Sequence, residues 1–138
     1  MRIVILDAQG GGVGRKLIEL LKKELPEQPL IAVGTNTAAT TAMLKAGADQ
    51  AATGENAVRV TTSDADLILA PIGMLLCDGM LGEVTPEMAM ALGRAKAHKI
   101  LIPSQRCGVS IAGTPEMAMG DYAAAAVSEA AAFVRNGL

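Results

Sequence analysis

The sequence has very few aromatic residues and almost no excess charge, and both shortages narrow the range of functions. Its 138 residues include one tyrosine, one phenylalanine and no tryptophan, and the net charge is −2 at pH 7. Nucleic-acid binding needs a basic surface or aromatic side chains on which bases stack, and this chain has neither. We therefore expect no nucleic-acid partner.

Histidine, cysteine and long apolar runs are also scarce. Two cysteines, Cys77 and Cys107, are too few for the disulfide framework of a small secreted protein, although a redox pairing between them stays open. No spacing of His, Cys or carboxylate residues is typical of a metal site.

A transmembrane helix needs about 20 consecutive apolar residues, which this chain lacks, and no signal-peptide pattern opens it. We expect a cytoplasmic protein with no membrane partner and no bound metal.

The sequence is rich in small and flexible apolar residues. Apolar residues make up 51% of the chain, with 25 alanines and 8 methionines beside 15 glycines. Such residues fill a tightly packed core or form an adaptable surface for self-association, so a homo-oligomer stays open. The length suits a single domain over residues 1–138.

Short apolar runs alternate with helical patterns along the whole chain. The patterns predict strands over 3–6, 30–33, 49–52, 67–70, 99–102 and 109–112, and helices over 14–25, 37–46, 54–60, 85–97 and 121–135. This alternation predicts the α/β class, with a Rossmann-like open parallel sheet of about five or six strands and helices on both faces. Residues 71–84 show no clear period and are expected to form a functional or oligomer-forming loop.

The strongest functional signal is a glycine-rich run between the first strand and the first helix. It reads Asp7-Ala8-Gln9-Gly10-Gly11-Gly12-Val13-Gly14. Glycines there let backbone N–H groups approach a phosphate at the helix N-terminus. Aligned with the fingerprint G-x-G-x-x-G, the run matches at Gly11 and Gly14 but has Gln9 at the first glycine position. The Lys-Ser/Thr pair of the nucleotide triphosphatase P-loop is absent, so we expect binding of a phosphate-bearing small molecule or nucleotide without P-loop hydrolysis.

Two further patterns shape the predicted site. Arg15 and Lys16 stand in the first turn of the helix, where cations oppose the helix dipole unless an anion binds beside them. NAD-binding domains carry an acid at the end of the second strand, but residues 34–37 contain none, which argues against an ordinary NAD site. The ligand therefore stays unidentified, with a nucleotide, a coenzyme A-like molecule and a phosphorylated metabolite all open.

Ligands in open α/β sheets bind beyond the carboxyl ends of the strands, and this rule selects the candidate residues. The predicted binding residues are Asp7, Gln9, Gly10, Gly11, Gly12, Gly14, Arg15, Thr35, Asn36, Pro71, Ile72 and Gly73. Asn36 or Thr37 is equally well explained as a helix N-cap. The only histidine, His98, precedes the fifth predicted strand and belongs to the opposite edge, which argues against a histidine base.

Two other functions stay open. In an enzyme, Asp7, Asp78 or Glu83 would act as acid or base, with Arg106 as a charge clamp. Glu83 is better explained as a favourable charge before the helix that Thr85-Pro86 begins. In a ligand-free assembly protein, the loops and methionines would instead form a subunit interface.

The run Ile5-Leu6-Asp7-Ala8-Gln9-Gly10-Gly11-Gly12-Val13-Gly14 resembles the opening of a family of small bacterial proteins known only as a domain of unknown function. Members of that family open with an I-D-x-Q-G-G-G-x-G run. The likeness continues through Thr53-Gly54-Glu55, Pro71-Ile72-Gly73, Gly82-Glu83-Val84-Thr85-Pro86 and Lys99-Ile100-Leu101-Ile102-Pro103. The resemblance implies a compact α/β protein in which Gln9 belongs to the motif. It implies no activity and no catalytic residues.

Overall fold

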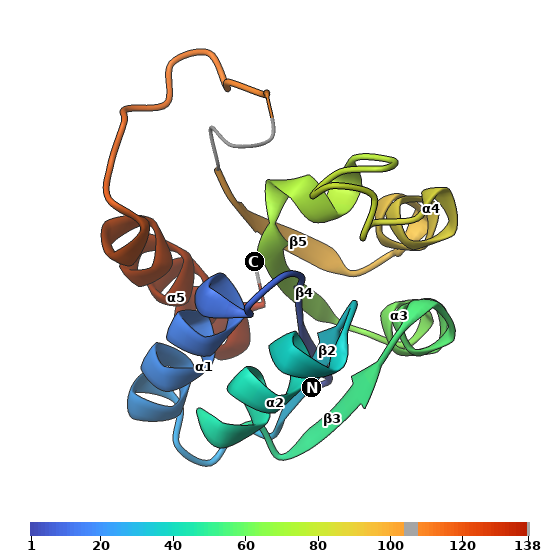
Figure 1. The fold of residues 1–138 in the computed structure, drawn as a ribbon. Coiled ribbons are helices and arrows are strands. Elements are labelled where there is room, and N and C mark those ends of the chain that lie inside the picture. The colour runs from blue at the N-terminus through green and yellow to red at the C-terminus, as the bar shows by residue number, and fades with distance from the viewer. Residues whose placement is uncertain (104–107, 138) are drawn as a thin grey trace.

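The computed structural model describes residues 1–103 and 108–137. Five strands form one parallel sheet in the order β3-β2-β1-β4-β5 (Figure 1). The strands are β1 (Ile3–Asp7), β2 (Leu30–Gly34), β3 (Gln50–Thr53), β4 (Leu67–Pro71) and β5 (His98–Ile102). The chain winds outward from β1 to one edge and then returns to β4 on the other side of β1. This order confirms the Rossmann-like fold and places the topological switch point between β1 and β4.

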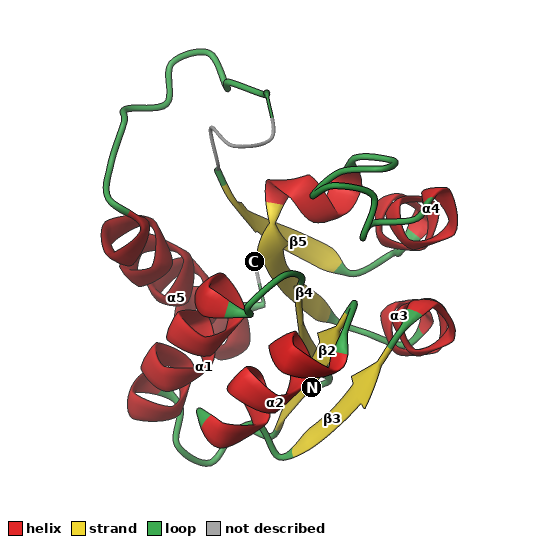
Figure 2. Ribbon diagram, in the orientation of Figure 1, coloured by secondary structure: helices red, strands yellow, loops and turns green. Residues whose placement is uncertain are grey.

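Helices cover both faces of the sheet (Figure 2). They are α1 (Gly12–Glu24), α2 (Thr37–Lys45), α3 (Glu55–Ser63), α4 (Pro86–Arg94) and α5 (Met119–Asn136), with a short 3-10 helix η1 (Ile72–Leu75) after β4. The helices α1, α2 and α5 pack on one face, and α3 and α4 pack on the other. None of the helices described is long and apolar enough to cross a membrane.

The central strand β1 shows why the sheet forms. All five of its residues are buried. Ile3 and Ile5 join the core beneath α1 and α5, whereas Val4 and Leu6 join the core beneath α3 and α4. Successive side chains of a strand point to opposite faces, so a strand covered on both sides needs an unbroken apolar run.

Side-chain caps set the starts of two helices as the sequence predicts. The Oγ1 atom of Thr85 accepts a hydrogen bond from the N–H of Met88 at 3.1 Å, and Pro86 occupies the first turn. Of the two candidate caps before α2, Asn36 is the one used, because its Oδ1 atom accepts from the N–H of Ala39 at 2.9 Å. These bonds satisfy backbone donors that lack a partner within the helix.

The predicted sixth strand over 109–112 is wrong. The described residues 108–118 instead form an almost wholly exposed connection that arches away from the sheet toward α5 (Figure 1). Within them the chain forms one backbone hydrogen bond of its own, from the N–H of Thr114 to the carbonyl of Ile111. A short apolar run favours a strand, but a strand also needs a neighbouring strand as a hydrogen-bonding partner, and none of the five described strands pairs with these residues.

Candidate functional site

Asp7 ends β1 and lies buried beneath the start of α1, with only 3% of its surface exposed. Its Oδ2 atom accepts a hydrogen bond from the N–H of Gly14 at 2.7 Å, and Oδ1 accepts from the N–H of Ala8 at 2.8 Å. Burial raises the pKa of Asp7, and the hydrogen bonds from Gly14 and Ala8 only partly offset this effect. The carboxyl group therefore fastens the β1–α1 loop from within.

The glycines of the β1–α1 loop divide into two kinds. A Cβ atom on Gly11 would lie 2.9 Å from the backbone of Ala39 in α2, and one on Gly14 would overlap the Met43 side chain. These two glycines allow the loop and α1 to pack closely on α2. A Cβ atom on Gly10 or Gly12 would meet nothing within 4 Å.

Gly10 and Gly12 are the open glycines, and both are exposed at the start of α1. Their N–H groups donate to no acceptor within residues 1–103 and 108–137. The first turn of α1 carries no acidic residue. These donors therefore stand at the positive end of the helix dipole, where an anion is favoured.

Arg15 is exposed beside the open glycines. It forms a 3.0 Å ion pair with Glu19, which offsets part of the unfavourable position of Arg15 near the helix start. Arg15 also lines a shallow hollow of about 480 Å³ together with Thr37, Ala38, Thr41, Ala42 and Lys45 of α2. Arg15 and Lys45 are the two cations among the lining residues of this hollow.

Glu83 joins three loops at the carboxyl edge of the sheet. Its Oε1 atom accepts hydrogen bonds from the N–H of Gln9, the hydroxyl of Thr35 and the side-chain amide of Asn36, each at 2.8 Å. The Asn36 amide also donates to the carbonyl of Gln9 at 3.0 Å. We call these four residues the Glu83 cluster.

The charge of Glu83 is stabilised by its partners. Partial burial alone would raise the pKa of Glu83, but the hydrogen bonds from Gln9, Thr35 and Asn36 outweigh burial and hold that pKa below its usual value. Because the three donors converge on one oxygen, the carboxylate has a fixed position and remains ionised at neutral pH.

The loop that carries Glu83, residues 76–84, is held in one conformation. The N–H of Asp78 donates to the carbonyl of Val84 at 2.7 Å, and the N–H of Val84 donates to the carbonyl of Gly79 at 3.2 Å. Asp78, Met80 and Leu81 adopt left-handed backbone conformations. Such conformations are unfavourable for non-glycine residues and persist where surrounding contacts impose them. Val84, next to Glu83, is fully buried and anchors the end of the loop.

The structure brings together only part of the predicted site. Gln9, Thr35 and Asn36 meet in the Glu83 cluster, and the exposed Asp78 lies outside that cluster. Pro71, Ile72 and Gly73 run from the end of β4 into η1, with Pro71 and Gly73 buried. Cys77 is exposed as a free thiol, whereas Cys107 and Arg106 lie outside the described residues.

The sequence offers Glu83 as an acid or base, or as a favourable charge before the helix that follows, and does not predict its contacts with Gln9, Thr35 and Asn36. Its N–H donor on Gln9 is 74 residues away in the chain. No local pattern signals such a contact, because the two loops meet only when β1 and β4 pair.

His98 lies at the amino end of β5, at the opposite edge, as predicted. Its ring stacks on Phe133 with the centroids 5.0 Å apart.

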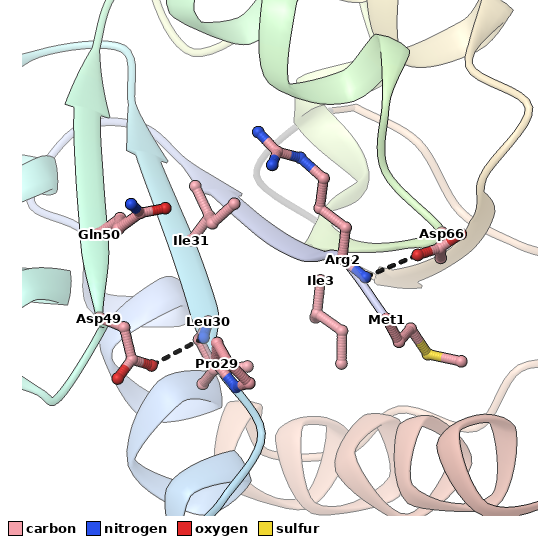
Figure 3. A pocket seen from close by; sticks show the side chains of 9 residues that line it. All are labelled: Met1, Arg2, Ile3, Pro29, Leu30, Ile31, Asp49, Gln50 and Asp66. Atoms are coloured by element: carbon pink, nitrogen blue, oxygen red, sulfur yellow. Dashed lines mark hydrogen bonds between the residues drawn. The ribbon is translucent and has the colours of Figure 1, made fainter.

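A second hollow of about 450 Å³ lies at the amino ends of the strands (Figure 3). Its lining residues are Met1, Arg2, Ile3, Pro29, Leu30, Ile31, Asp49, Gln50 and Asp66. Asp66 accepts from the N–H of Arg2, and Asp49 accepts from the N–H of Leu30, as Figure 3 shows. A further hydrogen bond from Lys22 lowers the pKa of Asp49. Both acids thus fasten the strand starts.

Metal ligands do not gather in the part of the chain that the structure describes. No group of three or more His, Cys, Asp or Glu residues there is placed to hold a metal ion.

Comparison with known proteins gives a family. Residues 2–135 match the family described as a domain of unknown function, DUF3842. The chain belongs to this family. This match confirms the resemblance seen in the glycine-rich opening.

No curated protein matches the chain. Among solved structures, the chain is similar to a dodecameric FMN-dependent UbiX-like decarboxylase from Escherichia coli O157:H7, with 17% sequence identity and a TM-score of 0.49. The likeness covers 99% of this chain and 95% of that one.

The titration of Glu83 at acidic pH tests whether its carboxylate accepts the three hydrogen bonds of the Glu83 cluster. Because folding lowers the pKa of Glu83, its ionised form stabilises the folded state above the ordinary value of about 4.3, and this contribution is lost as the pH falls through the lowered pKa. We expect an NMR titration of the Glu83 carboxyl carbon to give a midpoint below about 4.3. The Gln9 amide proton should report the same step.

The matched control is Glu83→Gln, which has no carboxyl group to titrate. The step at the Gln9 amide should disappear in this variant. A Glu83 midpoint at or above about 4.3 would contradict the hydrogen-bonded cluster.

Proposed function

We propose that this protein binds a phosphate-bearing small molecule at the β1–α1 loop, with the N–H groups of Gly10 and Gly12 as donors to the phosphate. The observation that carries the proposal is the division of the glycines. Gly11 and Gly14 are explained by packing on α2, whereas Gly10 and Gly12 leave open space and free donors at the start of α1. A tight turn alone does not require an open glycine on each side of Gly11.

The surrounding charges support an anion. The dipole of α1 favours negative charge at this place by about 0.3–1 kcal/mol at an exposed site, and the positive charges of Arg15 and Lys16 lie near the same helix end. Asp7 lies beneath the loop and would repel an anion when ionised, but its raised pKa shifts it toward the neutral form. Because Asp7 already binds the N–H of Gly14, the anion contacts only the N–H groups of Gly10 and Gly12.

The carboxylates are less suited to acid–base chemistry than to holding the loops. Both oxygens of Asp7 accept backbone hydrogen bonds, and Glu83 is held by three donors. We therefore favour ligand binding as the function of this edge. Self-association of the chain stays a prediction.

A charge substitution at Gly12 tests the proposal. Because a side chain at Gly12 meets open space, Gly12→Asp should fold normally while its carboxylate occupies the anion position. In a thermal-shift screen of inorganic phosphate, nucleotides, flavin mononucleotide, coenzyme A and sugar phosphates, we expect at least one compound to raise the Tm of the wild type. A ligand present at about 100 times its Kd adds roughly 2.7 kcal/mol to the free energy of unfolding.

The matched control is Gly12→Ala, which adds a side chain without charge. The Tm increase should be smaller in Gly12→Ala, because its Cβ atom enters the open space beside the donor, and should vanish in Gly12→Asp. Absence of any increase in the wild type, or an increase that survives in Gly12→Asp, would refute phosphate binding at this loop.

A further inference from the structure

The end of β2 is the second place where a nucleotide contacts a Rossmann-like domain. A carboxylate there accepts hydrogen bonds from the hydroxyls of the ribose, while the glycine-rich loop holds the phosphate. In this chain residues 34–37 contain no carboxylate. The sequence alone therefore argues against an ordinary NAD site.

The folded chain brings a carboxylate to this place from another loop. Glu83 is hydrogen-bonded to both residues that follow β2, Thr35 and Asn36, and also to Gln9 of the β1–α1 loop. It thus lies between the glycine-rich loop and the end of β2, where the ribose of a nucleotide with its phosphate at Gly10 and Gly12 would lie.

One carboxylate oxygen of Glu83 remains available. All three donors converge on Oε1, and Oε2 accepts no hydrogen bond from the described part of the chain. Within this part no buried side-chain oxygen or nitrogen lacks a partner, so Oε2 is open to solvent. The cluster therefore presents an ionised acceptor in a fixed position, as recognition of a hydroxyl donor requires.

We infer that Glu83 is the ribose-binding carboxylate of this protein and that the ligand is a 5′-ribonucleotide with free 2′ and 3′ hydroxyls. This inference rests on the proposed phosphate site at the β1–α1 loop. Oε2 accepts from the ribose hydroxyls, while Oε1 keeps its three donors. A nucleotide phosphorylated at the 2′ position is excluded, because its phosphate would meet the Glu83 carboxylate.

The test compares ribose with deoxyribose in the wild-type protein. Calorimetric titrations with AMP, GMP and their 2′-deoxy counterparts should give a Kd about tenfold or more weaker for the deoxy form, since a hydrogen bond to a charged acceptor is lost. In Glu83→Gln the amide oxygen takes over the three donors and the amide nitrogen faces the ribose. The ratio of the two Kd values should then fall, because a neutral donor replaces the charged acceptor that the ribose hydroxyls prefer.

The outcomes separate this inference from the proposed function. If ribo- and deoxyribonucleotides bind equally and both are lost in Gly12→Asp, the phosphate site stands and the role of Glu83 is overturned. A ratio unchanged in Glu83→Gln also overturns it. If no nucleotide binds, the inference is overturned. The proposed phosphate site still stands if inorganic phosphate or ribose 5-phosphate raises the Tm of the wild type, and it is refuted too if neither does.

Discussion

Replacing Gly11 by alanine is expected to destabilise the protein by about 2–5 kcal/mol, from a left-handed backbone that costs about 1–2 kcal/mol for a non-glycine residue and an overlap that costs about 1–3 kcal/mol. Gly11 has a φ of +74°. Its added Cβ atom would lie 2.9 Å from both the Cα and the carbonyl oxygen of Ala39. These are backbone atoms of α2, so the overlap is relieved only if the helix shifts.

Thermal and urea unfolding measure this effect, and the adjacent Gly12→Ala variant is the control. The Tm of Gly11→Ala should fall by roughly 5–20 °C. Gly12→Ala should equal the wild type or exceed it slightly, because alanine is favoured over glycine in a helix by up to about 1 kcal/mol. A Gly11→Ala protein that melts within about 2 °C of the wild type would show that the loop does not pack on α2.

Removing the Asp7 carboxyl group is the other change with a large expected effect. In Asp7→Ala the N–H groups of Ala8 and Gly14 lose their acceptor in a buried place. Each unsatisfied buried donor costs about 1–3 kcal/mol. We expect a clear loss of stability in urea unfolding, together with faster hydrogen exchange at Gly14.

The variant Asp7→Asn removes the titratable charge and keeps one of the two acceptor oxygens. Because burial raises the pKa of Asp7 in the folded state, the stability linked to its protonation is full below the unfolded value of about 3.9 and is lost as the pH rises through the raised pKa. The free energy of unfolding of the wild type minus that of Asp7→Asn should therefore decrease as the pH rises from acid toward neutral. An increase over the same range would mean that the pKa of Asp7 is lowered.

Local patterns predicted the regular elements well where each depends on nearby residues. The apolar run of β1 and the Thr85-Pro86 start of α4 carry their information within a few positions. The helix α1 begins at Gly12, two residues before the predicted start, because its cap is the left-handed backbone of Gly11, which apolar periodicity does not report. The strand expected over 109–112 failed because pairing depends on a neighbour that local sequence does not specify.

The candidate site was predicted only in part, for the same reason. The glycine-rich run and its place at the start of α1 follow from the order of the residues. The distinction between the packed Gly11 and the open Gly12 depends on where α2 lies. The position of Asp7 after a strand predicts a ligand contact, and the structure adds that its buried carboxyl group binds the loop backbone.

The sequence by itself determined the α/β alternation, the family and the glycine-rich loop, because each is encoded in contiguous residues. Only the tertiary structure decided which backbone donors stay open and which carboxylate stands at the end of β2. Glu83 reaches Gln9 and Thr35 across separations of 74 and 48 residues. Such contacts arise from the pairing of β1 with β2 and β4 and from the strained loop over residues 76–84. They are properties of packing, and no local pattern of residues contains them.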